Sequence, residues 1–176
     1  VPSAPIVTEI APEAPVTEPV EDEGNSLAEP EVVDVPGATI ETAIPVGDAL
    51  EGSGWAVKVI GFDEDATSEI MAENMFNERP KHGKYAMVEF RVTRTGPGSG
   101  DAFYDLFPSL IVRHQSYEEA SAVLPNDMSQ RSKIPPGVSA TGTFGFDVPR
   151  AGTENAVVYL EIDGRGPSTD GFFQVP

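Results

Sequence analysis

Carboxylates are the first candidates for chemistry in this sequence. Asp63, Glu64 and Asp65 follow one another, and Asp101 and Asp105 lie in or beside a glycine-rich turn. Carboxylate oxygens are the ligands that a hard cation such as Ca²⁺ prefers. The Asp-x-Asp-x-Asp-Gly spacing of a calcium loop is absent, however, and neighbouring side chains on an extended segment point to opposite faces. Two interpretations stay open, a weak Ca²⁺ site or solvated loop charge, and we favour the second.

The residues that enzymatic catalysis needs are scarce. The sequence has no cysteine, and His82 and His114 are its only histidines. His82 stands in a Pro-Lys-His-Gly stretch, which is typical of a solvated turn rather than of a general base. The sequence contains no Gly-x-Ser-x-Gly elbow, no glycine-rich phosphate loop and no His-Glu-x-x-His motif. We therefore predict no catalytic residue, no cofactor and no enzymatic activity.

A cluster of aromatic residues is the stronger candidate for function. Phe103, Tyr104 and Phe107 stand within five residues of one another. If this segment is a strand, alternation leaves either Tyr104 or the pair of phenylalanines on the outer face. Exposed aromatic side chains are frequent anchors of binding interfaces. The alternative is that a loop or a second sheet covers both faces, so these three residues are candidates for an interaction surface.

The elements that must position these residues read as strands. The clearest is the run 84–95, whose apolar side chains fall on one face and whose mostly polar ones fall on the other. The apolar face consists of Ala86, Val88, Phe90 and Val92. Three further runs alternate in the same way, namely 55–60, 140–149 and 157–162. Short runs of this kind, separated by Gly, Pro, Asn and Asp, predict an all-β sandwich with Trp55 in its core.

Two segments do not fit the strand pattern. The stretch 66–76 contains helix formers and predicts a short helix, for which Asp65 is a possible cap. The stretch 116–124 is compatible with a helical turn or with a strand that begins at Ala120. Between them, glycine and proline in 96–101 predict a turn.

The N-terminal part differs in composition from the rest. The first basic residue is Lys58, and twelve acidic residues precede it, interspersed with prolines. We predict that residues 1–37 form a disordered, acidic, Pro-rich linker and that 38–176 form one folded domain. In extended polyproline form the linker would reach on the order of 110 Å. It serves either as a spacer that lifts the domain off a surface, which we favour, or as an inert solubilising tail.

Charge and hydropathy limit the partners and the location. The net charge is −18, and the part from Lys58 onward is still acidic and carries no basic stripe. Such a surface repels phosphate backbones, so we predict no binding to nucleic acid. No apolar run is long enough to predict a transmembrane segment. The sequence begins at Val1 rather than Met, which suggests that a signal or lipid-anchor segment precedes it and that the location is extracellular or cell-surface.

Six short motifs follow one another along the folded part. They are 73–77, 80 with 83–85, 105–106, 124–127, 136–142 and 146–149. This order resembles the uncharacterised immunoglobulin-like domain of actinobacterial secreted proteins and lipoproteins, a family grouped with the mycobacterial immunoprotective extracellular protein. Some members bear a telomeric repeat-binding factor label, against which the acidic composition argues.

The resemblance has consequences for fold and stability. It implies an immunoglobulin-like antiparallel β-sandwich displayed outside the cell, often lipid-tethered, with no established catalytic residues. Many relatives hold cysteines where Ser121 and Gly145 stand here, so a family disulfide worth about 2–4 kcal/mol is missing. Core packing must then hold the two sheets together.

Together these observations predict a non-catalytic interaction module, extracellular or on the cell surface, carried on a flexible spacer. Its partner would be an unknown protein or cell-envelope ligand, and we expect a monomer. The alternative function is an envelope module that binds a small molecule or Ca²⁺.

Overall fold

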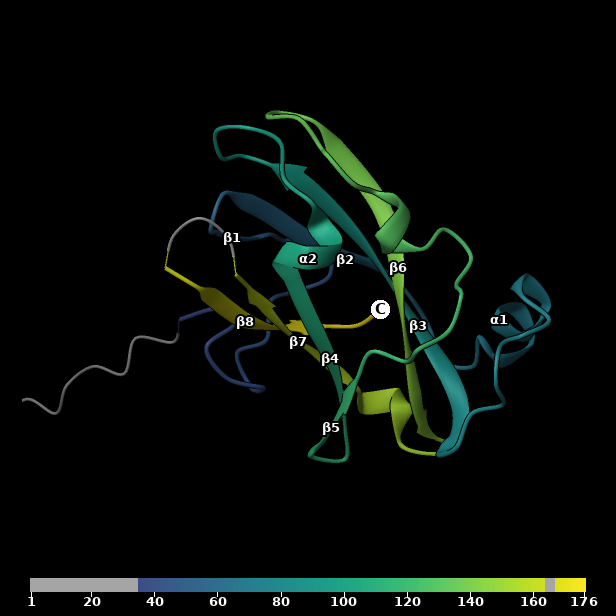
Figure 1. Cartoon of the computed structure of the whole chain (residues 1–176). Helices are drawn as coiled ribbons and strands as arrows, with labels where there is room; N and C mark the ends of the chain where they lie inside the picture. The colour runs from purple at the N-terminus through teal and green to yellow at the C-terminus, as the bar shows by residue number, and fades with distance from the viewer. Residues whose placement is uncertain (1–34, 164–166) are drawn as a thin grey trace, which may run out of the picture. The chain divides into compact units, whose positions relative to one another are not determined.

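The computed structural model describes residues 35–163 and 167–176. The predicted linker 1–37 therefore lies, up to residue 34, outside the described residues. The described strands form two four-stranded antiparallel sheets, which Figure 1 shows as separate layers. This arrangement confirms the predicted all-β antiparallel sandwich.

The first sheet has the order β1-β2-β3-β6 and the second the order β5-β4-β7-β8. The strands of the first sheet are β1 (Leu50–Gly52), β2 (Trp55–Asp63), β3 (Gly83–Arg94) and β6 (Ser139–Pro149). The strands of the second are β4 (Leu106–Val112), β5 (Gln115–Glu118), β7 (Val157–Ile162) and β8 (Thr169–Gln174). Four short helical segments connect them: α1 (Thr67–Glu73), α2 (Ala102–Asp105), η1 (Met128–Gln130) and η2 (Thr153–Asn155).

The core lies between the two sheets and follows from the alternation in the sequence. All four apolar side chains predicted to share a face of β3 are buried, including Phe90. Phe90 meets Phe144 of β6 edge to face, with ring centroids 5.5 Å apart. The second sheet contributes residues such as Leu110, Leu160 and Phe173, which are equally buried. Each large side chain stabilises the fold by about 2 kcal/mol through removal of apolar surface from water.

Trp55 is fully buried, as predicted, and it connects the core to α2. Its indole N–H donates a hydrogen bond to Oδ2 of Asp105 over 3.0 Å. The guanidinium of Arg94 lies 5.0 Å from the ring centroid and donates to backbone carbonyls of Gly54 and Gly98. A Cβ atom at Gly100 would lie 2.4 Å from Cζ2 of the tryptophan, so only glycine fits there. The turn 96–101 and α2 are thus both fixed against the core.

The outer face of β3 is only partly solvated, which the sequence pattern did not predict. Tyr85 was expected on the polar face, but it is 5% exposed because α1 packs over it. A small second cluster forms there from Ala66, Ile70, Tyr85 and Leu124. The predicted helix is confirmed as α1, yet the predicted cap is wrong. Ala66 is the N-cap residue, and the Asp65 carboxylate instead accepts a hydrogen bond from the Thr67 amide.

The ambiguous stretch 116–124 is neither of the two expected structures. The strand β5 ends at Glu118, and an irregular segment then runs over β6, where the Ala120 amide donates to the carbonyl of Gly145 over 2.8 Å. A Cβ at Gly145 would lie 2.7 Å from Cδ2 of Leu124. The segments that carry Ser121 and Gly145 are therefore neighbours, and the absence of a side chain at 145 makes room for Leu124.

The segment before β1 packs along strand β8. The Gly37 carbonyl accepts a hydrogen bond from the Phe172 amide over 2.9 Å, and Ile44 forms a parallel bridge with Phe173. Ile44 is 4% exposed and belongs to the main core. This segment thereby covers an edge of the second sheet, which would otherwise present unpaired backbone groups.

Candidate functional site: an aromatic cleft beside strand β4

The residues before β4 form a helical turn, not a strand. The Asp101 carboxylate accepts a hydrogen bond from the Phe103 amide over 3.2 Å and caps α2, and the chain becomes extended at Leu106. A helical turn rotates successive side chains by about 100°, whereas a strand rotates them by 180°. The prediction that only Tyr104 or the phenylalanine pair would face outward is therefore wrong.

Tyr104 and Phe107 are both exposed, by 72% and 51% respectively. Phe103 is half-buried, stacks on Phe144 of the core with centroids 6.4 Å apart, and meets Tyr104 edge to face at 5.3 Å. One aromatic thus holds the turn to the core, while the other two remain available at the surface. No sequence pattern distinguishes these roles, because they depend on the capped turn.

All three predicted aromatics line one cleft of about 520 Å³, which we call the aromatic cleft. The strand register explains its floor. Ser109 of β4 pairs with Glu118 of β5 on one side and with Tyr159 of β7 on the other, so these side chains share the outer face of the sheet. The lining comprises Phe103, Tyr104, Leu106, Phe107, Pro108, Ser109, Ser116, Glu118, Glu119 and Tyr159.

The charged side chains in this lining are carboxylates. Glu119 remains more than a third exposed, yet burial beside the cleft, with a smaller contribution from Asp127, raises its pKa from the usual 4.5 to about 7. Burial, followed by the charge of Asp170, raises the pKa of Tyr159, whose hydroxyl donates to Asp170 over 3.3 Å. The sequence could not identify Glu118 and Glu119 as residues of the cleft, because both lie in the stretch 116–124, whose structure was ambiguous.

This arrangement favours one class of ligand. Aromatic faces carry negative electrostatic potential and attract cations that approach within about 6 Å of the ring. Two carboxylates and no Lys, Arg or His in the lining add to the same preference. The cleft is therefore suited to an organic cation, such as the ammonium or guanidinium group of a partner.

The acidic candidates for a Ca²⁺ site have partners within the protein. Asp63 accepts a hydrogen bond from the Asp65 amide over 2.9 Å, and Glu64 accepts from the Thr153 hydroxyl and lies 3.8 Å from Nζ of Lys84. Asp101 and Asp105 hold α2, as described above. Among residues 35–163 and 167–176, no three acidic or histidine side chains are grouped closely enough to hold one metal ion.

The two histidines lie on different loops. Nδ1 of His82 lies 3.5 Å from Oδ2 of Asp147 at the surface, and its ring meets Tyr117 edge to face. His114 stands in the turn between β4 and β5, at a second hollow that is described below. Neither histidine lines the aromatic cleft.

Comparisons with known proteins support the fold. No protein-family model matches the sequence, and no curated protein matches it. The yjhA protein from Bacillus subtilis is similar in structure, with a TM-score of 0.50 and 11% identity, covering 76% of this chain and 99% of that one. MPT63, a secreted protein from Mycobacterium tuberculosis, gives a TM-score of 0.52 and 15% identity, covering 75% and 97%. At such low identity the likeness shows the fold alone. The similarity to MPT63 agrees with the β-sandwich fold that the family resemblance of the sequence implied.

No helix among the described residues has both the length and the apolar character that crossing a membrane requires.

Proposed function

We propose that this protein is a non-catalytic interaction module, extracellular or on the cell surface, whose aromatic cleft receives an organic cation displayed by a protein or envelope ligand. One observation carries the proposal: the exposed Tyr104 and Phe107 border a cleft whose charged lining residues are all carboxylates. The acidic, proline-rich N-terminal sequence would act as the spacer.

The exposed aromatics support this proposal on energetic grounds. Two large side chains in solvent forgo the stabilisation that burial would give, and natural surfaces rarely concentrate such residues without a binding role. A cation held against an aromatic face gains about 0.5–2 kcal/mol, depending on how far it is desolvated. Tyr104 and Phe107, together with Glu118 and Glu119, would supply several such contributions at one point.

Two separate observations support the extracellular location. The N-terminal part of the sequence is acidic and rich in proline, a composition typical of a solvated tether. One structural neighbour is a secreted protein.

The experiment that tests the cleft is a titration, followed by NMR, with Nα-acetyl-lysine methylamide as the cation and its Nε-acetylated form as a neutral probe of similar shape. We expect the cation to bind more tightly, by about fivefold, because only it carries the positive charge that the ring faces and carboxylates attract. Tyr104→Leu and Phe107→Leu, which keep apolar bulk but remove the rings, should each weaken binding.

Phe76→Leu is the matched control, because Phe76 is an aromatic residue outside the cleft that is even more exposed, at 82%. It should leave binding unchanged. Equal affinity for the charged and neutral probes, or an equal loss in the Phe76 variant, would remove the basis for the proposal.

A further inference from the structure

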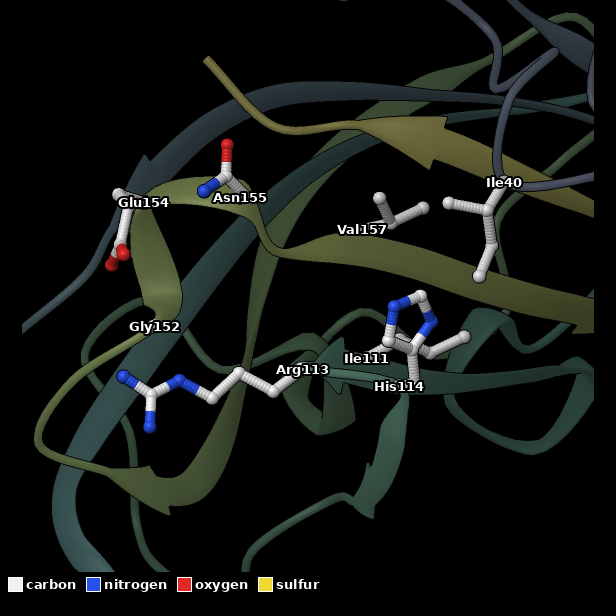
Figure 2. A pocket seen from close by; sticks show the side chains of 8 residues that line it. All are labelled: Ile40, Ile111, Arg113, His114, Gly152, Glu154, Asn155 and Val157. Carbon is white, nitrogen blue, oxygen red and sulfur yellow. The ribbon is translucent and has the colours of Figure 1, made fainter.

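A second hollow, of about 470 Å³, lies at the opposite end of β4 from the aromatic cleft. The β4–β5 turn, the η2 turn and the segment before β1 meet there, and Figure 2 shows the side chains around it. Pockets for small molecules commonly span about 300–1,000 Å³. We call this site the aliphatic hollow, because its apolar wall consists of Ile40, Ile111 and Val157.

The turn at the rim of the aliphatic hollow is strained. Val112 pairs with Gln115, so Arg113 and His114 are the two central residues of a tight hairpin, and their φ angles are +51° and +63°. Such turns are usually built from Asn-Gly, because those residues adopt positive φ at little cost. Arginine and histidine both disfavour positive φ, so this turn is held in a conformation that costs energy. Strain of this kind is concentrated at functional sites.

Gly152 fixes the direction of the Arg113 side chain. A Cβ atom at this position would lie 2.2 Å from Nε of Arg113 and 2.8 Å from its Cγ, so the arginine crosses the glycine backbone. Within residues 35–163 and 167–176, Arg113 and His114 have no side-chain hydrogen bond and no ion pair. Their donors therefore remain available to a ligand.

Figure 2 shows that the aliphatic hollow has a charged end and an apolar end. Arg113 and Glu154 lie on either side of Gly152, while the ring of His114 lies among the three aliphatic side chains. In the described structure no guanidinium nitrogen of Arg113 lies within 4 Å of a carboxylate oxygen of Glu154. The two charges therefore form no direct ion pair. Asn155, next to Glu154, adds an amide that both donates and accepts.

We propose that the aliphatic hollow binds a small zwitterion with an aliphatic body, of the class of the aliphatic α-amino acids. The guanidinium of Arg113 binds the carboxylate, and Glu154 binds the ammonium group. Ile40, Ile111 and Val157 cover the aliphatic body. This site is separate from the aromatic cleft and does not depend on the function proposed for it.

The presence of both charges distinguishes this ligand from a simple carboxylate. An anion without an ammonium group would meet Arg113 but would also face Glu154, whose charge opposes it. Another carboxylate, Glu41, lies near His114. The pKa of Glu41 is lowered, first by hydrogen bonds to its own backbone and to Thr39 and to a smaller extent by His114. The surroundings are therefore acidic on that side as well. A zwitterion satisfies the arginine and the glutamate together.

The test uses four probes with the full chain: L-leucine, N-acetyl-L-leucine, L-leucinamide and glycine. Leucine has both charges and the aliphatic side chain. N-acetyl-leucine keeps the side chain and the carboxylate only, leucinamide keeps the side chain and the ammonium only, and glycine keeps both charges but has no side chain. Binding is followed through the ring resonances of His114, and His82 serves as an internal reference because it lies on another loop and lines neither cavity. We expect leucine to bind, and each of the other three to bind about tenfold more weakly, since each lacks one contact.

Three variants complete the test. Arg113→Asn suits the positive φ, so it should fold normally, as its thermal melting would verify, and lose about tenfold in leucine affinity. Glu154→Gln should lose a similar factor. Lys133→Asn is the matched control, because Lys133 is also a cation at positive φ but lies outside the hollow. This variant should bind leucine with the same affinity as the original protein.

Three results would overturn the proposal. One is that no probe shifts His114, and another is that N-acetyl-leucine binds as tightly as leucine. The third is that the Arg113 and Lys133 variants behave alike.

Discussion

The aromatic cleft and the aliphatic hollow lie at opposite ends of β4 and differ in how the backbone holds them. The cleft is built on α2, which Asp101 caps and which Asp105 ties to the buried Trp55. The hollow is built on the Arg113–His114 turn, which opposes the preference of its residues. At the cleft, binding geometry and stability therefore depend on the same contacts, whereas at the hollow the binding residues reduce stability.

The largest effect is expected at the cleft, from Asp105→Ala. This change leaves the indole N–H of Trp55 without its acceptor in a part-buried position. We expect the free energy of unfolding to fall by about 2 kcal/mol, as measured by urea denaturation. Because α2 loses its tie to the core, affinity for the cationic probe should fall as well, while leucine binding at the aliphatic hollow should not change.

Asp105→Asn provides the control, since the amide oxygen can still accept from Trp55. It should lose less than about 1 kcal/mol. Equal destabilisation by alanine and asparagine would show that the hydrogen bond does not connect the cleft to the core.

At the aliphatic hollow we expect a substitution to raise the free energy of unfolding rather than lower it. Replacing the strained turn by Arg113→Asn with His114→Gly supplies the residues that positive φ favours. The free energy of unfolding should rise by about 1–2 kcal/mol, measured in the same denaturation experiment, because the cost of the left-handed conformation is removed. Leucine affinity should fall by about tenfold or more in the same variant, as measured by calorimetric titration because the His114 ring is no longer present.

Lys133→Gly calibrates this gain, because Lys133 also has a positive φ, of +56°, but does not line the hollow. It should stabilise by about 1 kcal/mol and leave binding intact. If the double variant were no more stable than the original, the strain argument for the hollow would be lost.

The two sites also differ in how far the sequence could predict them. Period-2 alternation identified β3, β6, β7 and the buried position of Trp55, because a strand with one apolar face carries that information locally. The close spacing of aromatic residues in the sequence selected Phe103, Tyr104 and Phe107 as candidates.

What the sequence could not supply was the effect of distant segments. Tyr85 is buried because α1 folds over it, and Glu119 reaches the cleft because the chain after β5 turns toward β6. The aliphatic hollow was missed altogether, since Ile40, Arg113 and Glu154 come from three separate segments. Only an unusual pair of residues in a two-residue turn could have pointed to it, and that requires the strand boundaries to be known.

The smallest effect is expected from Glu119→Gln, which separates the electrostatics of the cleft from its shape. The pKa of Glu119 is about 7 in the folded protein and near 4.5 when unfolded, so between these values the folded state binds the proton more strongly. Stability due to this group therefore falls as pH rises from 4.5 to 7 and stays lower above 7. Because the carboxylate is screened by solvent, we expect a fall of about 1 kcal/mol, which the glutamine variant should lack.

Comparing the two proteins by urea denaturation at pH 5 and pH 8 isolates Glu119, since every other titratable group is present in both proteins and its contribution cancels. The other titratable groups around Glu119 are Glu118, Asp127 and Tyr159, and of these the negative charge of Asp127 contributes to the raised pKa of Glu119. Cation binding should change in the opposite direction to stability, strengthening in the original protein as Glu119 ionises and remaining nearly constant in the variant. A parallel pH dependence of stability in both proteins would mean that Glu119 is fully solvated, and the cleft would then select its ligand through the aromatic rings and Glu118 alone.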